Sequence, residues 1–262
     1  MIRVGHIDFI NTIPLDLEDT TCLNYNKIKG VPTAINKMLL NGEVDVGVIS
    51  ISFYLEHRED LLRIGNLGIV SDGPAMSILL FSSTDISKSL SNKVLKVYET
   101  PKSATSVLLN RIILSKFYGI HIVSESVISE ADAVLLIGDD ALLEKQKGRW
   151  SYVYDLGDEW KRFTGLPAVF AVLATNKKVF KEKREELENY LKLLRKNYEK
   201  SMRNLDIAVA KAKRKTHLEE EVLYKYFQSL KYELGKKEEE SIALFEKLIS
   251  EVSIYSGINR LI

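Results

Sequence analysis

Val44-Asp45-Val46-Gly47-Val48-Ile49 is an apolar, β-branched run of the kind that forms a buried strand. A helical segment precedes it, with Pro32 at its start and Asn41-Gly42 at its end, the usual places for proline and glycine at helix termini. Ile2-Arg3-Val4-Gly5 predicts an earlier strand. Strands that alternate with helices in this way predict α/β layering with parallel strands.

The alternation continues beyond this segment. Further strands are predicted at Ser77–Phe81, Val94–Tyr98, Ala133–Ile137 and Ala168–Thr175. The last of these is an uncharged run typical of a buried strand. Neither an internal repeat nor a low-complexity linker interrupts the pattern. The predicted fold class is therefore α/β.

The chain after Lys177 has a different character. All five prolines precede it, and the tail is dense in Lys, Glu and Leu. Apolar residues recur there at spacings of three and four, which predicts three helical faces. These faces are Leu187, Leu191, Leu194, Tyr198 and Met202, then Leu218, Val222, Tyr226 and Leu230, then Ile242, Phe245 and Leu248 or Ile249. We interpret the charged positions between them as the solvated surface of scaffold helices.

Composition excludes several classes of protein. The 262 residues are 45% hydrophobic and 28% charged, as in ordinary globular domains and unlike disordered or collagen-like chains. Because 37 Lys and Arg face 36 Asp and Glu, the chain lacks the basic excess of a nucleic-acid-binding domain. Cys22 is the only cysteine, which excludes an internal disulfide and a cysteine metal cluster. The four histidines are scattered, so no metal site is predicted.

The N-terminal stretch predicts no targeting segment, since it has neither a signal-length apolar run nor a small-residue cleavage site. No run approaches the roughly 18 apolar residues that span a bilayer. We therefore expect a cytoplasmic protein with neither a membrane nor a nucleic-acid partner. No oligomeric state follows from the sequence.

Hydroxyl side chains follow one of the predicted strands. Ser103, Thr105 and Ser106 stand between the strand Val94–Tyr98 and the next helix. Free backbone N–H groups at a helix start, with hydroxyls beside them, bind a carboxylate or phosphate. Ser103 is explained equally well as an N-cap. Both interpretations stay open on these residues alone.

Other loops place polar residues at strand ends in the same manner. Asn11 follows the first strand, Asp139 follows another, and Ser77 heads a strand after the turn Ser71-Asp72-Gly73-Pro74. Ligands of open α/β sheets bind outside the carboxyl ends of strands, so these positions suit a site. Taken alone, Asp139 is better explained as a helix cap and Thr164-Gly165 as part of a tight turn.

Familiar catalytic motifs are missing. The chain has no GxGxxG opening a helix, no Walker A loop, no HExxH and no GxSxG. His6 is the one histidine near a candidate loop, and a lone histidine is more often structural than catalytic. The residues by themselves predict an α/β protein with a cleft for a small anion.

Taken together, the loops resemble one family. Gly5-His6-Ile7-Asp8-Phe9-Ile10-Asn11-Thr12-Ile13-Pro14-Leu15 resembles the opening of the chorismate dehydratases of the futalosine route to menaquinone. Six further segments resemble the family in the same order: Asn41–Gly47, Ser71–Ser77, Ser103–Ser106, Leu136–Asp139, Asp155–Trp160 and Thr164–Ala171. Each segment is short, and their common order makes the resemblance specific.

The resemblance implies a periplasmic-binding-protein-like fold of the second type, with two α/β lobes and a ligand cleft between them. Lobe 1 would comprise residues 1–83 and 176–262, and lobe 2 would comprise residues 84–175. The strands Ser77–Ser82 and Ala168–Thr175 would be the two crossings between lobes. The segment Leu17–Lys29 is short for the family, so the rim of the cleft is expected to differ.

The resemblance also implies an activity. The family's enzymes are hydro-lyases that remove water from chorismate, a small dicarboxylate, and form 3-(1-carboxyvinyloxy)benzoate. No cofactor is expected, because the lost hydroxyl and proton leave an aromatic ring. By match to the family's motifs, Asn11 and Ser77 would be catalytic. The residues expected to bind the substrate are Ser103, Thr105, Ser106, Asp139, Thr164 and Gly165.

Two alternatives compete with this function. One is a non-catalytic protein of the same fold that binds a small anion, although its extracellular forms need a signal peptide that the N-terminal stretch does not show. The other is the sister enzyme that forms dihydroxynaphthoate, whose opening segment is similar to Ser-Pro-Cys-Pro-Asn-Asp. Here Ile7–Thr12 reads Ile-Asp-Phe-Ile-Asn-Thr, which favours the dehydratase.

Overall fold

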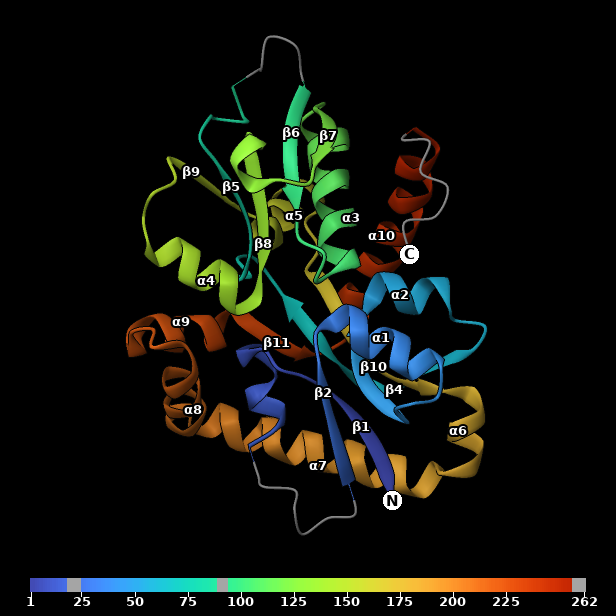
Figure 1. The fold of residues 1–262 in the computed structure, drawn as a ribbon. Helices are drawn as coiled ribbons and strands as arrows, with labels where there is room; N and C mark the ends of the chain where they lie inside the picture. The colour runs from blue at the N-terminus through green and yellow to red at the C-terminus, as the bar shows by residue number, and fades with distance from the viewer. Residues whose placement is uncertain (18–24, 89–93, 256–262) are drawn as a thin grey trace. The chain divides into compact units, whose positions relative to one another are not determined.

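The computed structural model describes residues 1–17, 25–88 and 94–255, and it forms two compact units (Figure 1). Unit 1 comprises Met1–Val70 and Val169–Gly235, and unit 2 comprises Ser71–Ala168 and Lys236–Ile262. Each unit is assembled from segments that are distant in the sequence. Cys22 lies outside the described residues.

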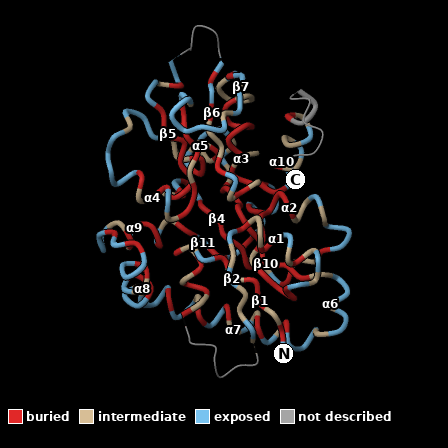
Figure 2. The backbone as a smooth tube through the Cα atoms, viewed as in Figure 1, coloured by how far each residue is buried: buried red, intermediate tan, exposed pale blue. Residues whose placement is uncertain are grey.

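Unit 1 is built on a six-stranded sheet in the order β11-β4-β10-β3-β1-β2. Its strands are β1 (Ile2–Ile7), β2 (Tyr25–Gly30), β3 (Val46–Ser50), β4 (Leu61–Ser71), β10 (Ala168–Asn176) and β11 (Leu230–Glu233). β1 runs parallel to β2 and β3, as the alternation of strands and helices predicts. β10 is buried along almost its whole length and pairs antiparallel with β3 (Figure 2).

Seven helices of unit 1 lie within the described residues. They are η1 (Ile10–Leu15), α1 (Pro32–Leu40), α2 (Ile51–Glu56), α6 (Lys177–Glu182), α7 (Arg184–Arg203), α8 (Asp206–Thr216) and α9 (Glu220–Ser229). In α1, Pro32 stands at the first helical position and Asn41 is the C-cap, which confirms the predicted limits. The close approach of α1 to β1 requires Gly5, because a Cβ there would lie 2.7 Å from Cγ2 of Ile35.

The buried face of α7 differs from the predicted one. The sequence pattern places Leu191, Tyr198 and Met202 on it, and Met202 is 38% exposed in the structure. The helix instead buries Leu187, Tyr190, Leu194, Asn197 and Ser201. Hydrophobicity alone misses two of these positions because Asn197 and Ser201 are polar and are buried through hydrogen bonds to another segment.

Unit 2 is built on a five-stranded sheet in the order β7-β6-β8-β5-β9. Its strands are β5 (Ile78–Ser82), β6 (Val94–Glu99), β7 (His121–Glu125), β8 (Ala133–Ile137) and β9 (Tyr152–Asp155). β6 is parallel to β7 and β8, whereas β5 is antiparallel to β8 and β9. The carboxyl ends of β6, β8 and β9 therefore share one edge of the sheet with the start of β5.

Helices cover this second sheet. They are α3 (Ala104–Ile112), the π-helix η3 (Ile113–Phe117), η4 (Ile128–Glu130), α4 (Gly138–Gln146), α5 (Leu156–Thr164) and α10 (Lys236–Tyr255). Trp160 of α5 is buried to 1% exposure, and its ring packs against Phe117 and Phe245. Its Nε1 donates to Oγ of Ser241, 2.9 Å away. These contacts join α10 to unit 2, where it also packs against α3 (Figure 1).

The observed division of the chain differs from the predicted boundaries in two respects. The first concerns β5 and β10. The predicted boundaries place β5 in lobe 1 and nearly all of β10 in lobe 2, whereas β5 pairs within the sheet of unit 2 and β10 pairs with β3 of unit 1. The second is α10, which the sequence-based boundaries assign to lobe 1 with the rest of the tail. Its contacts with Trp160 place it in unit 2 instead.

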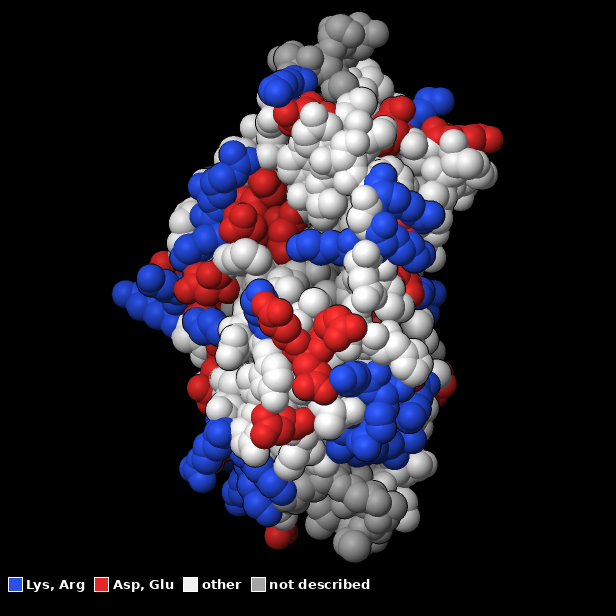
Figure 3. Space-filling model, turned by 90° about the vertical axis from the view of Figure 1, so that its left-hand side faces the viewer, with Lys and Arg blue, Asp and Glu red and all other residues white. Residues whose placement is uncertain are grey.

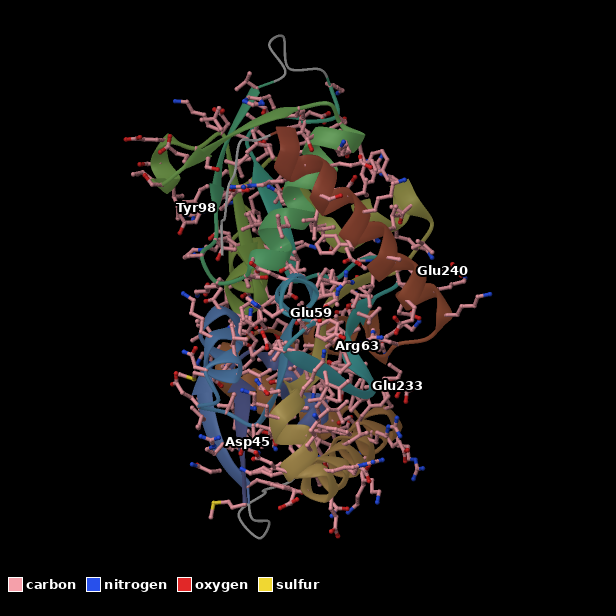
Figure 4. The ribbon with its side chains drawn as sticks, turned by 90° about the vertical axis from the view of Figure 1, so that its right-hand side faces the viewer. Asp45, Glu59, Arg63, Tyr98, Glu233 and Glu240 are labelled. Carbon is pink, nitrogen blue, oxygen red and sulfur yellow. The ribbon has the colours of Figure 1, made fainter. Side chains whose placement is uncertain are left out.

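Asp45 closes an ion-pair network in unit 1. This carboxylate, labelled in Figure 4, lies just before β3 and is fully buried. It accepts hydrogen bonds from the backbone N–H and guanidinium of Arg3 at 2.8 and 2.7 Å and from Nζ of Lys183 at 3.0 Å. Burial disfavours the charged carboxylate, but these bonds outweigh it and lower the pKa of Asp45 to about 2.

We expect Asp45→Asn to lower the free energy of unfolding by about 2 kcal/mol at neutral pH. A carboxyl whose pKa falls on folding stabilises the protein above its ordinary pKa of 3.8, and that stabilisation is lost as the pH falls toward 2. Urea unfolding between roughly pH 2 and 5 should therefore show a shallower decline for the variant than for the parent protein. Parallel curves would contradict the assignment.

Candidate functional site

Unit 1 presents Asn11 on η1, directly after β1. Side chains from distant segments fix the backbone of this short helix. Asn197 Nδ2 donates to the carbonyl of Leu15 at 3.0 Å, and Ser201 Oγ donates to that of Pro14 at 2.9 Å. The hydroxyl of Tyr232 donates to the carbonyl of Asn11 at 2.8 Å. The position of Asn11 is therefore set by α7 and β11.

The side-chain oxygen of Asn11 is the notable atom of this residue. This Oδ1 is shielded from solvent and has no hydrogen-bond partner among the described residues. Buried amide oxygens are almost always hydrogen-bonded in folded proteins, so an orphaned one is a candidate contact for a ligand. This observation fits the role that the sequence predicts for Asn11.

His6 lies near the end of β1, shortly before η1 in the sequence. Burial lowers its pKa, and Asp16, whose Oδ2 is 3.6 Å from the imidazole Nδ1, opposes the shift. The ring borders a cavity of about 20 Å³, enough for a water molecule. The cavity is lined by Gly5, His6, Ile7, Thr12, Leu15, Asp16, Val48, Tyr190 and Leu194. A lowered pKa favours the neutral imidazole, which accepts a proton more readily than it donates one.

Unit 2 brings several of the predicted residues to one edge of its sheet. Ser77 stands just before β5, and its carbonyl accepts from the N–H of Gly138 at 2.7 Å. Gly138 precedes Asp139 and begins α4 after β8. Ser77 and Asp139 are thus neighbours across the pair of strands β5 and β8. The remaining members of this edge are the hydroxyl residues after β6.

Ser103, Thr105 and Ser106 surround the start of α3, and all three are buried. Ser103 is the N-cap: its Oγ accepts from the N–H of Ser106 and lies 3.0 Å from the Oγ of Ser106. The N-cap interpretation is confirmed, and a role in binding an anion stays a prediction. Since β6 and β8 are parallel neighbours, this helix start lies beside that of α4, and Lys102 pairs with Asp140 between the two loops.

Asp139 does not cap its helix, contrary to the simpler interpretation of the sequence. The N-cap of α4 is Ile137, and no side chain makes the capping hydrogen bond. Asp139 and Asp140 lie in the first turn, where the helix dipole favours negative charge. An ionised carboxylate only accepts hydrogen bonds, so a ligand contact of Asp139 would suit a hydroxyl rather than a second carboxylate.

Thr164 and Gly165 lie apart from this edge. They end α5, whose first turn follows β9, so they stand roughly 13 Å along the helix from its start. The hydroxyl of Thr164 donates to the carbonyl of Trp160 at 2.7 Å and accepts from the N–H of Leu166 at 3.1 Å. Gly165 adopts a φ of +73° as the C-cap. The turn interpretation is thus confirmed, and substrate contact stays a prediction.

Sequence reasoning missed two residues near Ser77. Met76 has a φ of +60°, a left-handed conformation rare for residues other than glycine. Asp155 reaches back to the same loop and accepts from the N–H groups of Ala75 and Met76. The sequence Asp-Leu-Gly-Asp is typical of a helix start with Asp155 as the N-cap. Nothing near it in the sequence indicates that Asp155 also binds the N–H groups of Ala75 and Met76.

Within residues 1–17, 25–88 and 94–255, no group of three or more His, Cys, Asp or Glu side chains is placed to hold a metal ion. None of the helices in those ranges is long and apolar enough to cross a bilayer. Basic and acidic side chains are interspersed over the face in Figure 3, in keeping with the near balance of the two charges.

Comparison with known sequences identifies a family. The family model for menaquinone biosynthesis matches residues 2–251. A chorismate dehydratase of Thermus thermophilus is 30% identical over 171 residues, which cover 57% of this chain and 61% of that protein. A chorismate dehydratase of Campylobacter jejuni is 29% identical over 174 residues, 64% of each chain. Both matches cover less than two thirds of the relative's length.

Comparison with solved structures identifies the fold. A crystal structure of an Archaeoglobus fulgidus protein has a TM-score of 0.70 at 20% identity and covers 98% of this chain and 97% of that one. The periplasmic aliphatic sulphonate binding protein SsuA of Escherichia coli has a TM-score of 0.70 at 13% identity, with 99% and 94% covered. A Candida albicans protein described as having the generic periplasmic binding protein fold scores 0.67 at 11% identity, with 97% and 94% covered. The predicted periplasmic-binding-protein-like fold is confirmed.

Proposed function

Because the chain belongs to the menaquinone biosynthesis family, we propose that it is a hydro-lyase that converts chorismate to 3-(1-carboxyvinyloxy)benzoate and water. Two relatives that bear the name chorismate dehydratase support this proposal. The observation that carries it in the structure is the gathering of Ser77, Asp139 and the hydroxyls at the start of α3 on one edge of a sheet.

The chemistry suits the polar groups present. A ring hydroxyl leaves as water, the neighbouring ring carbon loses a proton, and the ring becomes aromatic, so no electron acceptor is required. The protein has to hold a dianion and align the departing hydroxyl. Backbone N–H groups and hydroxyls at a helix start can hold a carboxylate without a fixed cation. We assign this role to Ser103, Thr105 and Ser106.

Asn11 and Ser77 are assigned to the reacting part of the substrate. The amide of Asn11 would accept from the ring hydroxyl through the Oδ1 that has no partner among the described residues, or donate to the enolpyruvyl carboxylate through its NH2 group. The hydroxyl of Ser77 would fix the reacting geometry. We further propose that the enolpyruvyl carboxylate of chorismate takes the proton itself, which dispenses with an ionisable side chain as general base.

The decisive experiment mixes the purified protein with chorismate, without added metal or cofactor, and follows the products by liquid chromatography and mass spectrometry. Loss of one water with formation of the enolpyruvyl-substituted benzoate supports the proposal. Binding of chorismate without turnover would favour the binding-protein alternative, which shares this fold. Absence of binding by a folded sample would reject chorismate as the ligand.

Asn11→Ala should lower kcat for chorismate by roughly tenfold or more and leave the binding affinity within about threefold, since a hydrogen bond made mainly in the transition state is lost. The backbone carbonyl that accepts from Tyr232 is retained in the variant, so the fold of η1 should persist. Steady-state kinetics and equilibrium binding separate the two effects. Asn41→Ala, at the exposed end of α1, is the matched control. Unchanged turnover would remove Asn11 from the mechanism.

A further inference from the structure

The loop between β4 and β5 holds an unfavourable backbone conformation next to Ser77. Met76 has a φ of +60°, and Gly73 has a φ of +126°. Glycine adopts such angles freely, but a residue with a Cβ loses on the order of 1–2 kcal/mol. Such a conformation persists only where the surroundings fix it, and it directly precedes the residue assigned to the chemistry.

One carboxylate binds two N–H groups of this loop. Asp155 Oδ1 accepts from the N–H of Ala75 at 2.9 Å, and its Oδ2 accepts from the N–H of Met76 at 2.6 Å. Oδ1 also caps α5 by accepting from the N–H of Gly157 at 3.0 Å. Burial raises the pKa of Asp155, and the four backbone N–H groups around it oppose that shift by favouring the ionised form.

Close packing holds the same loop against α5. A Cβ on Gly157 would lie 2.4 Å from Oγ of Ser71 and 2.7 Å from the carbonyl of Gly73. The loop and the first turn of the helix are therefore in direct backbone contact. On its other side, the carbonyl of Ser77 accepts from Gly138. Asp155 thus fixes the two peptide groups on either side of Ala75, and α4 fixes the peptide group that follows Ser77.

We propose that Asp155 is a positioning residue: by binding the N–H groups of Ala75 and Met76, it maintains the left-handed conformation of Met76 and so sets the direction of the Ser77 side chain. This inference rests on the proposed function, which assigns Ser77 to the reaction. Capping of α5 and positioning of Ser77 are two separate tasks of one carboxylate, and they respond differently to substitution.

Asp155→Asn separates the two tasks. Asparagine is as good an N-cap as aspartate, so α5 should keep its start. Its NH2 group is a donor, however, and cannot accept from either Ala75 or Met76, so one of the two loop bonds is lost. In assays well below the unfolding temperature of the variant, we expect kcat for chorismate to fall by about tenfold and KM to change by less than about threefold.

A second substitution tests the route through Met76. Glycine at position 76 adopts a φ of +60° without steric cost, so the loop then depends less on Asp155. The double variant Asp155→Asn with Met76→Gly should recover at least about threefold of the lost kcat. If Asp155 acted only as a cap of α5, Met76→Gly would restore nothing. Failure of this rescue, or an unchanged kcat in Asp155→Asn alone, would overturn the proposal.

Asp45→Asn is the matched control. Asp45 also accepts a backbone N–H through a buried carboxylate, but it lies in unit 1 beside Arg3. The control should lose stability and retain kcat. A comparable fall in kcat for Asp45→Asn would show that lost stability explains both variants, and it would overturn the positioning role.

Amide hydrogen exchange distinguishes failure of this inference from failure of the proposed function. Measured without substrate, the N–H groups of Ala75 and Met76 should exchange faster in Asp155→Asn than in the parent protein. Equal exchange rates would overturn the positioning role whatever the enzyme does. If the parent protein forms no product from chorismate while exchange responds as expected, the proposed function fails and Asp155 still fixes the loop.

Discussion

Ser77→Ala should lower kcat for chorismate by about 100-fold or more, while KM changes by less than about threefold. Loss of one preorganised hydrogen-bond donor to the transition state typically has an effect of this size. The substitution removes only the hydroxyl oxygen at a buried position, and the backbone carbonyl that accepts from Gly138 is retained. Steady-state kinetics on the purified variant, with product identified by mass, is the measurement.

Ser82→Ala is the control for this variant. Ser82 is also buried and stands at the other end of β5, where its Oγ donates to the carbonyl of Thr84 at 2.8 Å. Its replacement should leave kcat within about twofold and lower stability by about 1 kcal/mol. If Ser77→Ala were as active as this control, Ser77 would have no catalytic part.

Trp160→Ala should have the largest effect on stability, a loss of about 3–5 kcal/mol in the free energy of unfolding. The side chain is 1% exposed, and its removal would leave a cavity between α5, η3 and α10. It would also leave Oγ of Ser241 without the indole N–H that it accepts. Chemical unfolding followed by circular dichroism is the measurement.

Trp150→Ala gives the comparison. Trp150 is only partly buried, although it packs against the small cluster of Leu79, Phe81 and Ala141 and donates to Glu144. Its loss should destabilise the protein by about 1–2 kcal/mol, because less apolar area is uncovered. Equal losses for the two tryptophans would contradict the central place of Trp160 in unit 2.

The strands follow from local sequence because their cause is local. The apolar runs at β3, β5, β8 and β10 are buried, and an uninterrupted apolar run has few other stable conformations in an α/β protein. The Pro-to-Gly limits of α1 and the hydroxyl N-cap at Ser103 are likewise set within a few residues. Ser77 and Asp139 lie close together because β5 and β8 are neighbouring strands. The alternation of strands and helices predicts the fold class but not this strand order.

What the sequence does not indicate depends on residues far apart in the chain. The buried face of α7 includes the polar residues Asn197 and Ser201, whose hydrogen-bond partners lie in η1. The spacing of hydrophobic residues alone therefore predicts the wrong face. The left-handed φ of Met76 depends on Asp155, about 80 residues later. Assignment of α10 to unit 2 depends on Trp160 and Ser241. Such long-range contacts produce no periodic pattern in the sequence.

The placement of α10 bears on how the protein is made. A ribosome releases the strands of unit 2 well before Lys236–Tyr255 leaves the exit tunnel, and Trp160 has no Ser241 or Phe245 to contact until then. Unit 1 likewise waits for β10 to join β3. Neither unit can complete its core until these later segments have been synthesised. Until then the nascent chain carries exposed apolar surface, which is the kind of surface that chaperones bind.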